Sequence, residues 1–139
     1  MPSRLNPYLS FRSNAREAME FYKSVFGGHL SLMTFGDGGM ARDPAENNLI
    51  MHGQLETPDG YTIMGSDTPS SMEFRPAGGM TVSISGDDND KLRGYWHSLS
   101  PGATIAQPLE KAPWGDSFGM LVDRFGTPWM FNLADGQQE

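Results

Sequence analysis

The stretch NAREAMEFYKSVFGG, residues 14–28, decides the fold because it carries the signals that start, extend and end one helix. Apolar side chains recur at helical spacing, at positions 15, 18, 19, 22, 25 and 26, so one face of the helix is apolar. Asn14 followed by Glu17 matches a capping box, which predicts that the Asn14 side chain accepts hydrogen bonds from the first turn. Gly27 and Gly28 end the helix, since glycine adopts the left-handed conformation at little cost.

Short strands surround this helix. Alternating or β-rich stretches predict strands at residues 8–11, 29–35, 49–56 and 61–66, with a long loop over 36–48. In the turn over residues 57–60, Pro58 and Gly60 occupy the positions that suit a type I turn followed by a glycine bulge. The predicted order is therefore strand, helix, strand, strand, strand.

The second half of the chain repeats this order. Strands are predicted at residues 80–85, 103–109, 118–122 and 129–133, and a helix begins in the acidic run 87–90 and ends before Pro101. Phe21 and Tyr22 match Tyr95 and Trp96 at an offset of 74 residues, as Asn14 matches Asp88 and Gly28 matches Gly102. Gly60 and Met64 match Gly126 and Met130 at an offset of 66, and the long loop in the first half accounts for the difference. Matches at two constant offsets indicate an internal repeat.

The repeat predicts an α+β fold of two βαβββ modules, residues 1–67 and 80–139, joined by a linker over 68–79 within one compact domain. One helix covers only one face of a small sheet. We therefore expect the two modules to form a cupped mixed sheet, with the helices on the convex face and a ligand-binding cleft on the concave face.

Composition limits the functional classes. The chain has 139 residues, a net charge of -7 and no cysteine, which excludes disulfides and thiolate metal sites and makes nucleic acid an unfavourable partner. No apolar run approaches the roughly 20 residues that a membrane helix needs, and the N-terminal residues form no apolar signal core. We expect a cytoplasmic protein that binds neither nucleic acid nor membrane.

Several stretches together resemble the PhnB-like branch of the vicinal oxygen chelate superfamily, which includes glyoxalases, bleomycin-binding proteins and extradiol dioxygenases. They are residues 7–11, 14–22, 25–28, 113–116 and 125–130, so the resemblance spans nearly the whole chain. It implies the two-module fold and a homodimer. PhnB-like proteins are often named after a ubiquinone methyltransferase, but the chain has no Gly-rich loop of the kind that opens a doubly wound sheet.

The resemblance also implies four metal-ligand positions, on the first and last strands of each module. By spacing they fall on Pro7, Met64, Met80 and Met130. Proline offers no side-chain ligand, and a thioether is a soft donor that does not suit Mn, Fe, Zn or Ni. We therefore predict an apolar cleft with no metal and no cofactor.

A second set of polar residues leaves an alternative open. His52, Gln54 and Glu56 alternate on one face of a predicted strand, and the turn register places Gln54 opposite Met64. His52 and Glu56 are the candidates for catalysis, in a metal-dependent lyase, isomerase or dioxygenase. A third hypothesis is a non-catalytic interaction protein.

Our first hypothesis is a protein that binds a small, partly apolar molecule. Trp129 is expected in the core, because its position alternates with that of Met130. The residues predicted to contact the ligand are Pro7, Leu9, His52, Gln54, Met64, Met80, Trp114, Phe118 and Met130.

Overall fold

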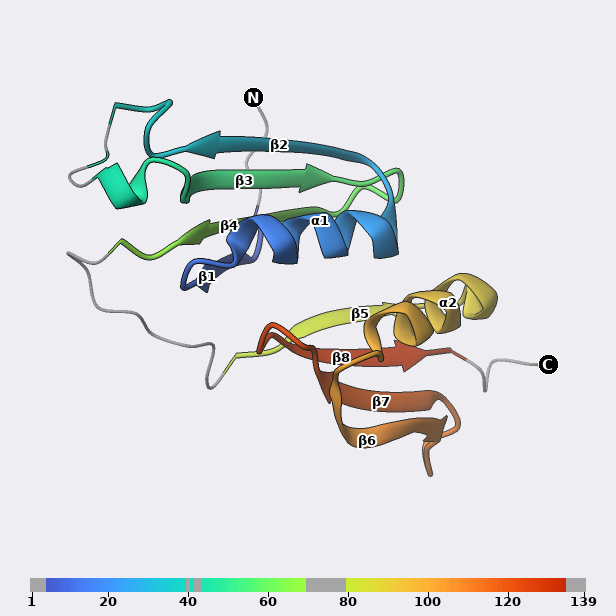
Figure 1. Ribbon diagram of the computed structural model, residues 1–139. Coiled ribbons are helices and arrows are strands. Elements are labelled where there is room, and N and C mark those ends of the chain that lie inside the picture. Colours follow the sequence, from blue (N-terminus) through green and yellow to red (C-terminus); the bar gives the residue numbers. More distant parts are fainter. Residues whose placement is uncertain (1–4, 40, 42–43, 70–79, 135–139) are drawn as a thin grey trace. The chain divides into compact units, whose positions relative to one another are not determined.

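Each half of the chain folds as a βαβββ unit, as the repeat predicts (Figure 1). The computed structural model describes residues 5–39, 41, 44–69 and 80–134, and the chain divides into units of residues 1–76 and 77–139. The predicted linker lies outside the described residues except for residues 68 and 69. The first unit contains β1 (Tyr8–Phe11), α1 (Ala15–Phe26), β2 (His29–Thr34), a 3-10 turn (Pro44–Glu46), β3 (Ile50–Glu56) and β4 (Thr62–Asp67). The second unit contains β5 (Val82–Gly86), α2 (Asn89–Leu99), β6 (Thr104–Lys111), β7 (Ser117–Val122) and β8 (Pro128–Leu133).

The two sheets have the same topology. The first has the strand order β1-β4-β3-β2 and the second the order β5-β8-β7-β6. In each sheet the first and last strands of the unit pair in parallel, and the other pairs are antiparallel. The fold is thus of the α+β class with two mixed four-stranded sheets. None of the helices in the described ranges is both long enough and apolar enough to cross a membrane.

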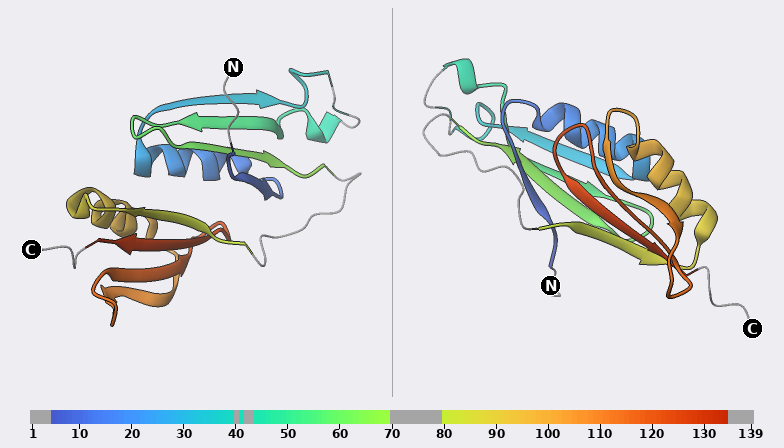
Figure 2. Two further views of the ribbon diagram at one scale, coloured as in Figure 1. Left: turned by 180° about the vertical axis from the view of Figure 1, so that it is seen from behind. Right: turned by 90° about the horizontal axis from the view of Figure 1, so that it is seen from below.

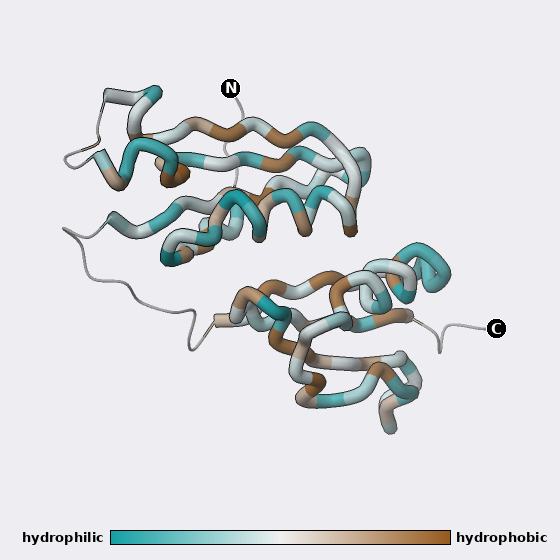
Figure 3. Tube along the Cα trace, viewed as in Figure 1, coloured by the Kyte–Doolittle hydropathy of each residue, from teal (hydrophilic) through white to brown (hydrophobic). Residues whose placement is uncertain are grey.

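One helix covers one face of each sheet (Figures 1 and 2). Hydrophobic and hydrophilic residues alternate along the strands, as expected for a sheet with one covered face (Figure 3). The apolar residues of α1 predicted from its periodicity are all buried: Ala15, Ala18, Met19, Tyr22, Val25 and Phe26. They pack over the strand residues whose side chains point to the same face, among them Phe11, Leu55 and Ile63.

Glycines in the sheets let the helices approach closely. Gly53 and Gly65 lie opposite each other on β3 and β4, and a Cβ added to Gly65 would lie 3.2 Å from the sulfur of Met19 on α1. Gly119 is the repeat counterpart of Gly53, and a Cβ there would lie 2.8 Å from the indole ring of Trp96 on α2. The repeat therefore also preserves the contact between sheet and helix.

The N-terminus of α1 corrects one prediction. The Asn14 side chain makes no capping hydrogen bond. Instead, the buried carboxylate of Asp67, at the end of β4, accepts hydrogen bonds from the backbone N–H groups of Ala15 and Ile50, each at 2.9 Å. One carboxylate from a distant strand thus satisfies an amide at the start of α1 and an amide at the start of β3, which removes the need for a local cap. In the second unit, the local cap is present: the Asp88 side chain accepts from the backbone N–H of Lys91.

The β3–β4 hairpin has the predicted turn, and the β7–β8 hairpin repeats it. Gly60 has φ +85° and Gly126 has φ +91°, and each donates its N–H to the carbonyl of the residue three positions earlier, Thr57 or Asp123. A side-chain oxygen of Thr57 or Asp123 then accepts the N–H of the residue four positions later. The same type of turn therefore joins the last two strands of each unit, with threonine at its first position in one unit and aspartate in the other.

Candidate functional site

Each sheet has an open face, formed by the strand residues that alternate with the core. On β1, Leu9 is buried with 9% of its surface exposed, whereas its neighbour Tyr8 is 50% exposed. On β3, the buried residues Gly53 and Leu55 alternate with His52, Gln54 and Glu56. Side chains on these open faces are available to a ligand, so the candidate site is built from them.

On the open face of the first sheet, four polar side chains form a continuous hydrogen-bonded chain, which we call the polar row: Tyr8, His52, Gln54 and Glu56. The Tyr8 hydroxyl oxygen lies 3.2 Å from Nδ1 of His52, and Nε2 of His52 lies 3.4 Å from Oε1 of Gln54. Nε2 of Gln54 donates to Oε2 of Glu56 at 2.5 Å. The pairing of β3 with β4 and of β4 with β1 produces this arrangement, because it brings Gln54 opposite Met64 and Met64 opposite Tyr8.

On the open face of the second sheet, apolar residues occupy the positions that correspond to the β3 residues of the polar row. At the repeat offset of 66, the counterparts of His52, Gln54 and Glu56 are Phe118, Met120 and Val122. Met120 pairs directly with Met130 across β7 and β8. The ring of Trp114, which is 62% exposed, meets the ring of Phe118 edge to face, with centroids 5.7 Å apart. We call Trp114, Phe118, Met120 and Met130 the apolar patch.

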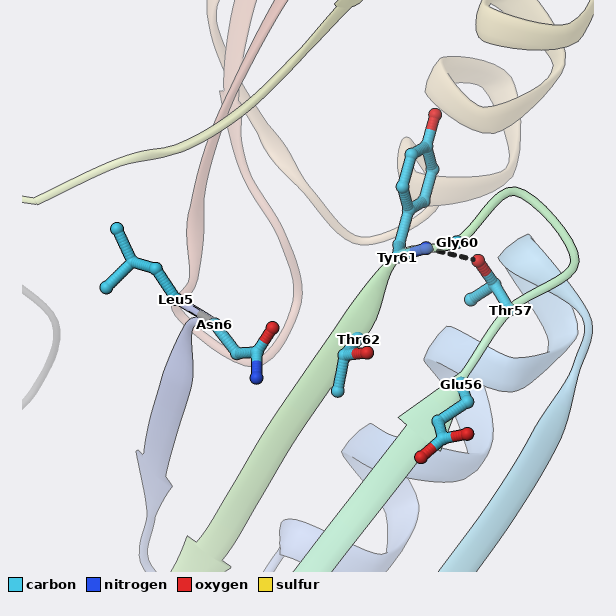
Figure 4. Close-up of a pocket in the computed structure, with 7 residues that line it drawn as sticks. All are labelled: Leu5, Asn6, Glu56, Thr57, Gly60, Tyr61 and Thr62. Atoms are coloured by element: carbon cyan, nitrogen blue, oxygen red, sulfur yellow. Dashed lines mark hydrogen bonds between the residues drawn. The ribbon is translucent and has the colours of Figure 1, made fainter. Parts of the chain in front are cut away.

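A pocket of about 470 Å³ lies at the end of the first sheet, next to the polar row (Figure 4). Its volume falls within the range of small-molecule sites. It is lined by Leu5, Asn6, Glu56, Thr57, Gly60, Tyr61 and Thr62. Glu56 provides the one charged side chain of this lining and is also the last member of the polar row, so the pocket and the row share a carboxylate.

The predicted placement of three residues is confirmed. His52 and Gln54 share the open face of β3, and Gln54 lies opposite Met64, as the hairpin register predicts. Trp129 belongs to the core with 1% of its surface exposed, and its indole N–H donates to Asp123.

The predicted positions on the first strands of the two modules need correction. Leu9 is buried in the core, so it belongs to the covered face and not to the open one. The residue opposite Met64 is Tyr8, not Pro7, and the residue opposite Met130 is Ser83, not Met80. Met80 precedes β5, which begins at Val82, and 78% of its surface is exposed. A parallel pair has no tight turn to fix its register, so spacing alone did not locate the residues that stand opposite Met64 and Met130.

The donor atoms at the corrected positions do not fit a divalent cation. They are the phenol of Tyr8, the hydroxyl of Ser83 and the thioethers of Met64 and Met130, whereas such ions prefer carboxylate or imidazole. Among the residues that the structure describes, no three His, Cys, Asp or Glu side chains are grouped so that they could hold a metal ion. His52 and Glu56 thus lack a third ligand of these kinds in the described part of the chain. The absence of a metal stays a prediction for elemental analysis.

Sequence reasoning missed two parts of the site. The contact between Tyr8 and His52 joins strands 44 residues apart in the chain, and no local signal reports it. The pocket brings Asn6, before β1, beside the turn that connects β3 to β4. The repeat contained no signal that fixed the register of β1 against β4, on which both contacts depend.

Comparison with known proteins places the chain in a family. Residues 3–131 match the family model described as 3-demethylubiquinone-9 3-methyltransferase, and the chain belongs to this family. Protein YjdN of Escherichia coli (strain K12) is 29% identical over 146 residues, which cover 96% of this chain and 97% of that protein. The crystal structure of protein PA1353 from Pseudomonas aeruginosa is 32% identical with a TM-score of 0.82, and the match covers 95% of this chain and 98% of that one.

Two further solved structures have a similar fold. A putative 3-demethylubiquinone-9 3-methyltransferase, PhnB protein, from Bacillus cereus has a TM-score of 0.71 at 24% identity, covering 95% of this chain and all of that chain. A glyoxylase/bleomycin resistance protein/dioxygenase domain from Frankia sp. EAN1pec has a TM-score of 0.66 at 14% identity, covering 99% and 96%. The resemblance to PhnB-like proteins and the glyoxalase-type fold is thereby confirmed.

Proposed function

We propose that this PhnB-like protein binds a small, partly apolar molecule on the open faces of its sheets, without a catalytic metal. The observation that carries the proposal is the apolar patch. Phe118, Met120 and Met130 lie on the open face of the second sheet, and Trp114, in the loop between β6 and β7, packs against Phe118. The opposite face holds the ordinary core residues Leu121, Trp129 and Phe131. Exposed apolar surface that the core does not need is typical of binding sites.

The side chains of the patch suit an aromatic or otherwise flat ligand. Trp114 stands on the ring of Phe118 and leaves most of its own surface free for contact. Met120 and Met130 are flexible and polarizable, so their thioethers adapt to ligands of different shape. Burial of apolar ligand surface against such side chains contributes about 25 cal/mol per Å².

Methyl transfer is not part of the proposal, although the family's description names it. Each sheet has only one parallel strand pair, in contrast to the doubly wound parallel sheet on which nucleotide-type cofactors bind. Fold and activity are separate questions, so the proposal rests on the side chains of the open faces.

Binding of Nile red, a neutral apolar dye, tests the apolar patch. We expect saturable binding to the folded protein, a rise in its melting temperature with dye concentration, and at least a tenfold weaker affinity in Trp114→Ala. Ile105→Ala is the matched control, because Ile105 is also exposed but pairs with Leu121 on the covered side of the sheet. Equal binding by the wild type and Trp114→Ala would contradict the proposal.

Elemental analysis of the purified protein separates this proposal from the metal-dependent alternative. Stoichiometric Mn, Fe, Ni or Zn would favour the enzyme with His52 and Glu56, and substoichiometric metal would favour the binding protein.

The homodimer stays a proposal that sedimentation of the purified protein tests.

A further inference from the structure

The polar row on the first sheet has a defined hydrogen-bond direction, and the Glu56 carboxylate sets it. An ionised carboxylate only accepts hydrogen bonds, so Gln54 must turn its NH₂ group toward Glu56, as the Nε2 to Oε2 hydrogen bond shows. The amide oxygen of Gln54 then faces Nε2 of His52. Because that oxygen only accepts, the neutral imidazole of His52 must carry its proton on Nε2.

This tautomer determines what Tyr8 can do. With the proton on Nε2, the Nδ1 atom of His52 presents a lone pair, so the hydroxyl of Tyr8 at 3.2 Å must donate to it. The hydroxyl proton of Tyr8 is then engaged in the hydrogen bond to His52, so the Tyr8 oxygen can only accept a hydrogen bond from a ligand. Half of the Tyr8 side chain is exposed on the open face, so a ligand can reach that oxygen.

We propose that Tyr8 and His52 form a proton-accepting site for a small molecule that carries a weakly acidic hydroxyl, a phenol or an enol. The ligand hydroxyl donates to the Tyr8 oxygen. Its O–H bond breaks as an O–H bond forms on Tyr8, and the original Tyr8 proton moves to Nδ1 of His52. The ligand becomes an oxyanion and His52 an imidazolium, so protons and charge balance without any other reactant. This inference rests on the proposed binding of small molecules and names a ligand class for it.

The side chains around His52 belong to the polar row and to β2. The Nε2–H of His52 already points at the Gln54 oxygen, which the Glu56 carboxylate polarises. On β2, His29 pairs opposite Glu56 and the uncharged Met33 pairs opposite His52. Among the strand residues that the structure describes on this face, the other titratable groups are Tyr8 and Glu56 within the row and His29 beside its end.

The same geometry selects against other ligand groups. A carboxylate arrives already ionised, so it has no proton for the Tyr8 oxygen and meets the charge of Glu56 nearby. A carbonyl only accepts and finds no free donor on Tyr8. An aliphatic alcohol can donate a hydrogen bond but is too weak an acid to protonate imidazole. A phenol or enol that an electron-withdrawing group makes more acidic both donates a hydrogen bond and ionises near neutral pH, which matches the site.

The probe for the experiment is 4-nitrophenol, because its phenolate absorbs visible light and its neutral form does not. At a pH where the free probe is mostly neutral, we expect wild-type protein to raise the visible absorbance in a saturable way. His52→Gln and Tyr8→Phe should lose at least nine-tenths of that rise, since one lacks the proton acceptor and the other the connecting hydroxyl. His97→Gln, an exposed histidine on α2, is the matched control and should behave as the wild type.

Nitrogen NMR of the imidazole gives a second readout that needs no ligand. We expect neutral His52 to show a protonated Nε2 and an unprotonated Nδ1. The opposite tautomer would overturn the inference, and so would an undiminished absorbance rise in His52→Gln.

Nile red binding separates this inference from the proposed function. Dye binding without ionisation of 4-nitrophenol overturns the proton-accepting site and leaves the apolar patch intact. Ionisation of 4-nitrophenol without dye binding contradicts the apolar patch and supports the polar row. Circular dichroism of each variant verifies that it is folded.

Discussion

Removal of the Asp123 carboxylate is expected to destabilise the second unit strongly. This buried side chain accepts three hydrogen bonds in the turn between β7 and β8. Its Oδ1 receives the backbone N–H groups of Phe125, at 2.8 Å, and Thr127, at 3.1 Å. Its Oδ2 receives the indole N–H of Trp129 at 2.9 Å. One carboxylate therefore fixes the turn and orients the largest core side chain of the unit.

The magnitude follows from the donors that lose their partner. In Asp123→Ala, the hydrogen bonds from Thr127 and Trp129 are buried, and each donor left unsatisfied there costs about 1–3 kcal/mol. The Phe125 N–H is only partly buried and can turn to water. We therefore expect the free energy of unfolding to fall by about 2–6 kcal/mol, a large fraction of the roughly 5–15 kcal/mol that stabilises a typical domain.

Urea unfolding, followed by circular dichroism, measures this change, and an unchanged m value shows that the same surface unfolds. Asp123→Asn keeps an oxygen for the two backbone donors but places an NH₂ group against the indole N–H, so we expect a loss of about 1.5–3 kcal/mol. In a Trp129→Phe background the indole donor is gone, and the same substitution should cost about 1–2 kcal/mol less. Asp87→Ala, at an exposed aspartate, is the control and should stay within about 0.5 kcal/mol.

Two results would refute the reasoning. The first is a loss below about 1 kcal/mol in Asp123→Ala at constant m, which would mean that water replaces the carboxylate. The second is additivity of Asp123→Asn and Trp129→Phe within about 0.3 kcal/mol, which would mean that the two side chains do not interact.

Two further predictions concern the first unit. Gly28→Ala should cost at least about 2 kcal/mol in urea unfolding, because φ is +104° and the new Cβ would lie 2.1 Å from the backbone oxygen of Glu56. Gly60→Ala, at φ +85° in open space, should cost only about 1 kcal/mol, and equal losses would contradict the steric argument. Asp67→Ala should cost about 2 kcal/mol or more and should speed hydrogen exchange at the amides of Ala15 and Ile50; unchanged exchange would exclude the proposed cap.

Local signals in the sequence were sufficient to predict the helices and strands. They were also sufficient to predict that His52 and Gln54 share one face of a strand. The helix over residues 15–26 follows from its apolar periodicity and the glycines after it. The hairpins follow from turn residues, and a tight turn also fixes the register of the two strands it joins. That is why the pairing of Gln54 with Met64 was predictable, and with it the shared face of His52 and Gln54.

The amino-acid sequence by itself determined the element order, the register of the β3–β4 hairpin and the repetition of one βαβββ unit. The tertiary structure alone decided that Asp67 caps α1, that Tyr8 and not Pro7 faces Met64, and that Tyr8 meets His52. The physical reason is the distance along the chain. A parallel pair is joined by a long connection that leaves its register free, so only the packing of the whole unit selects which side chains stand opposite each other.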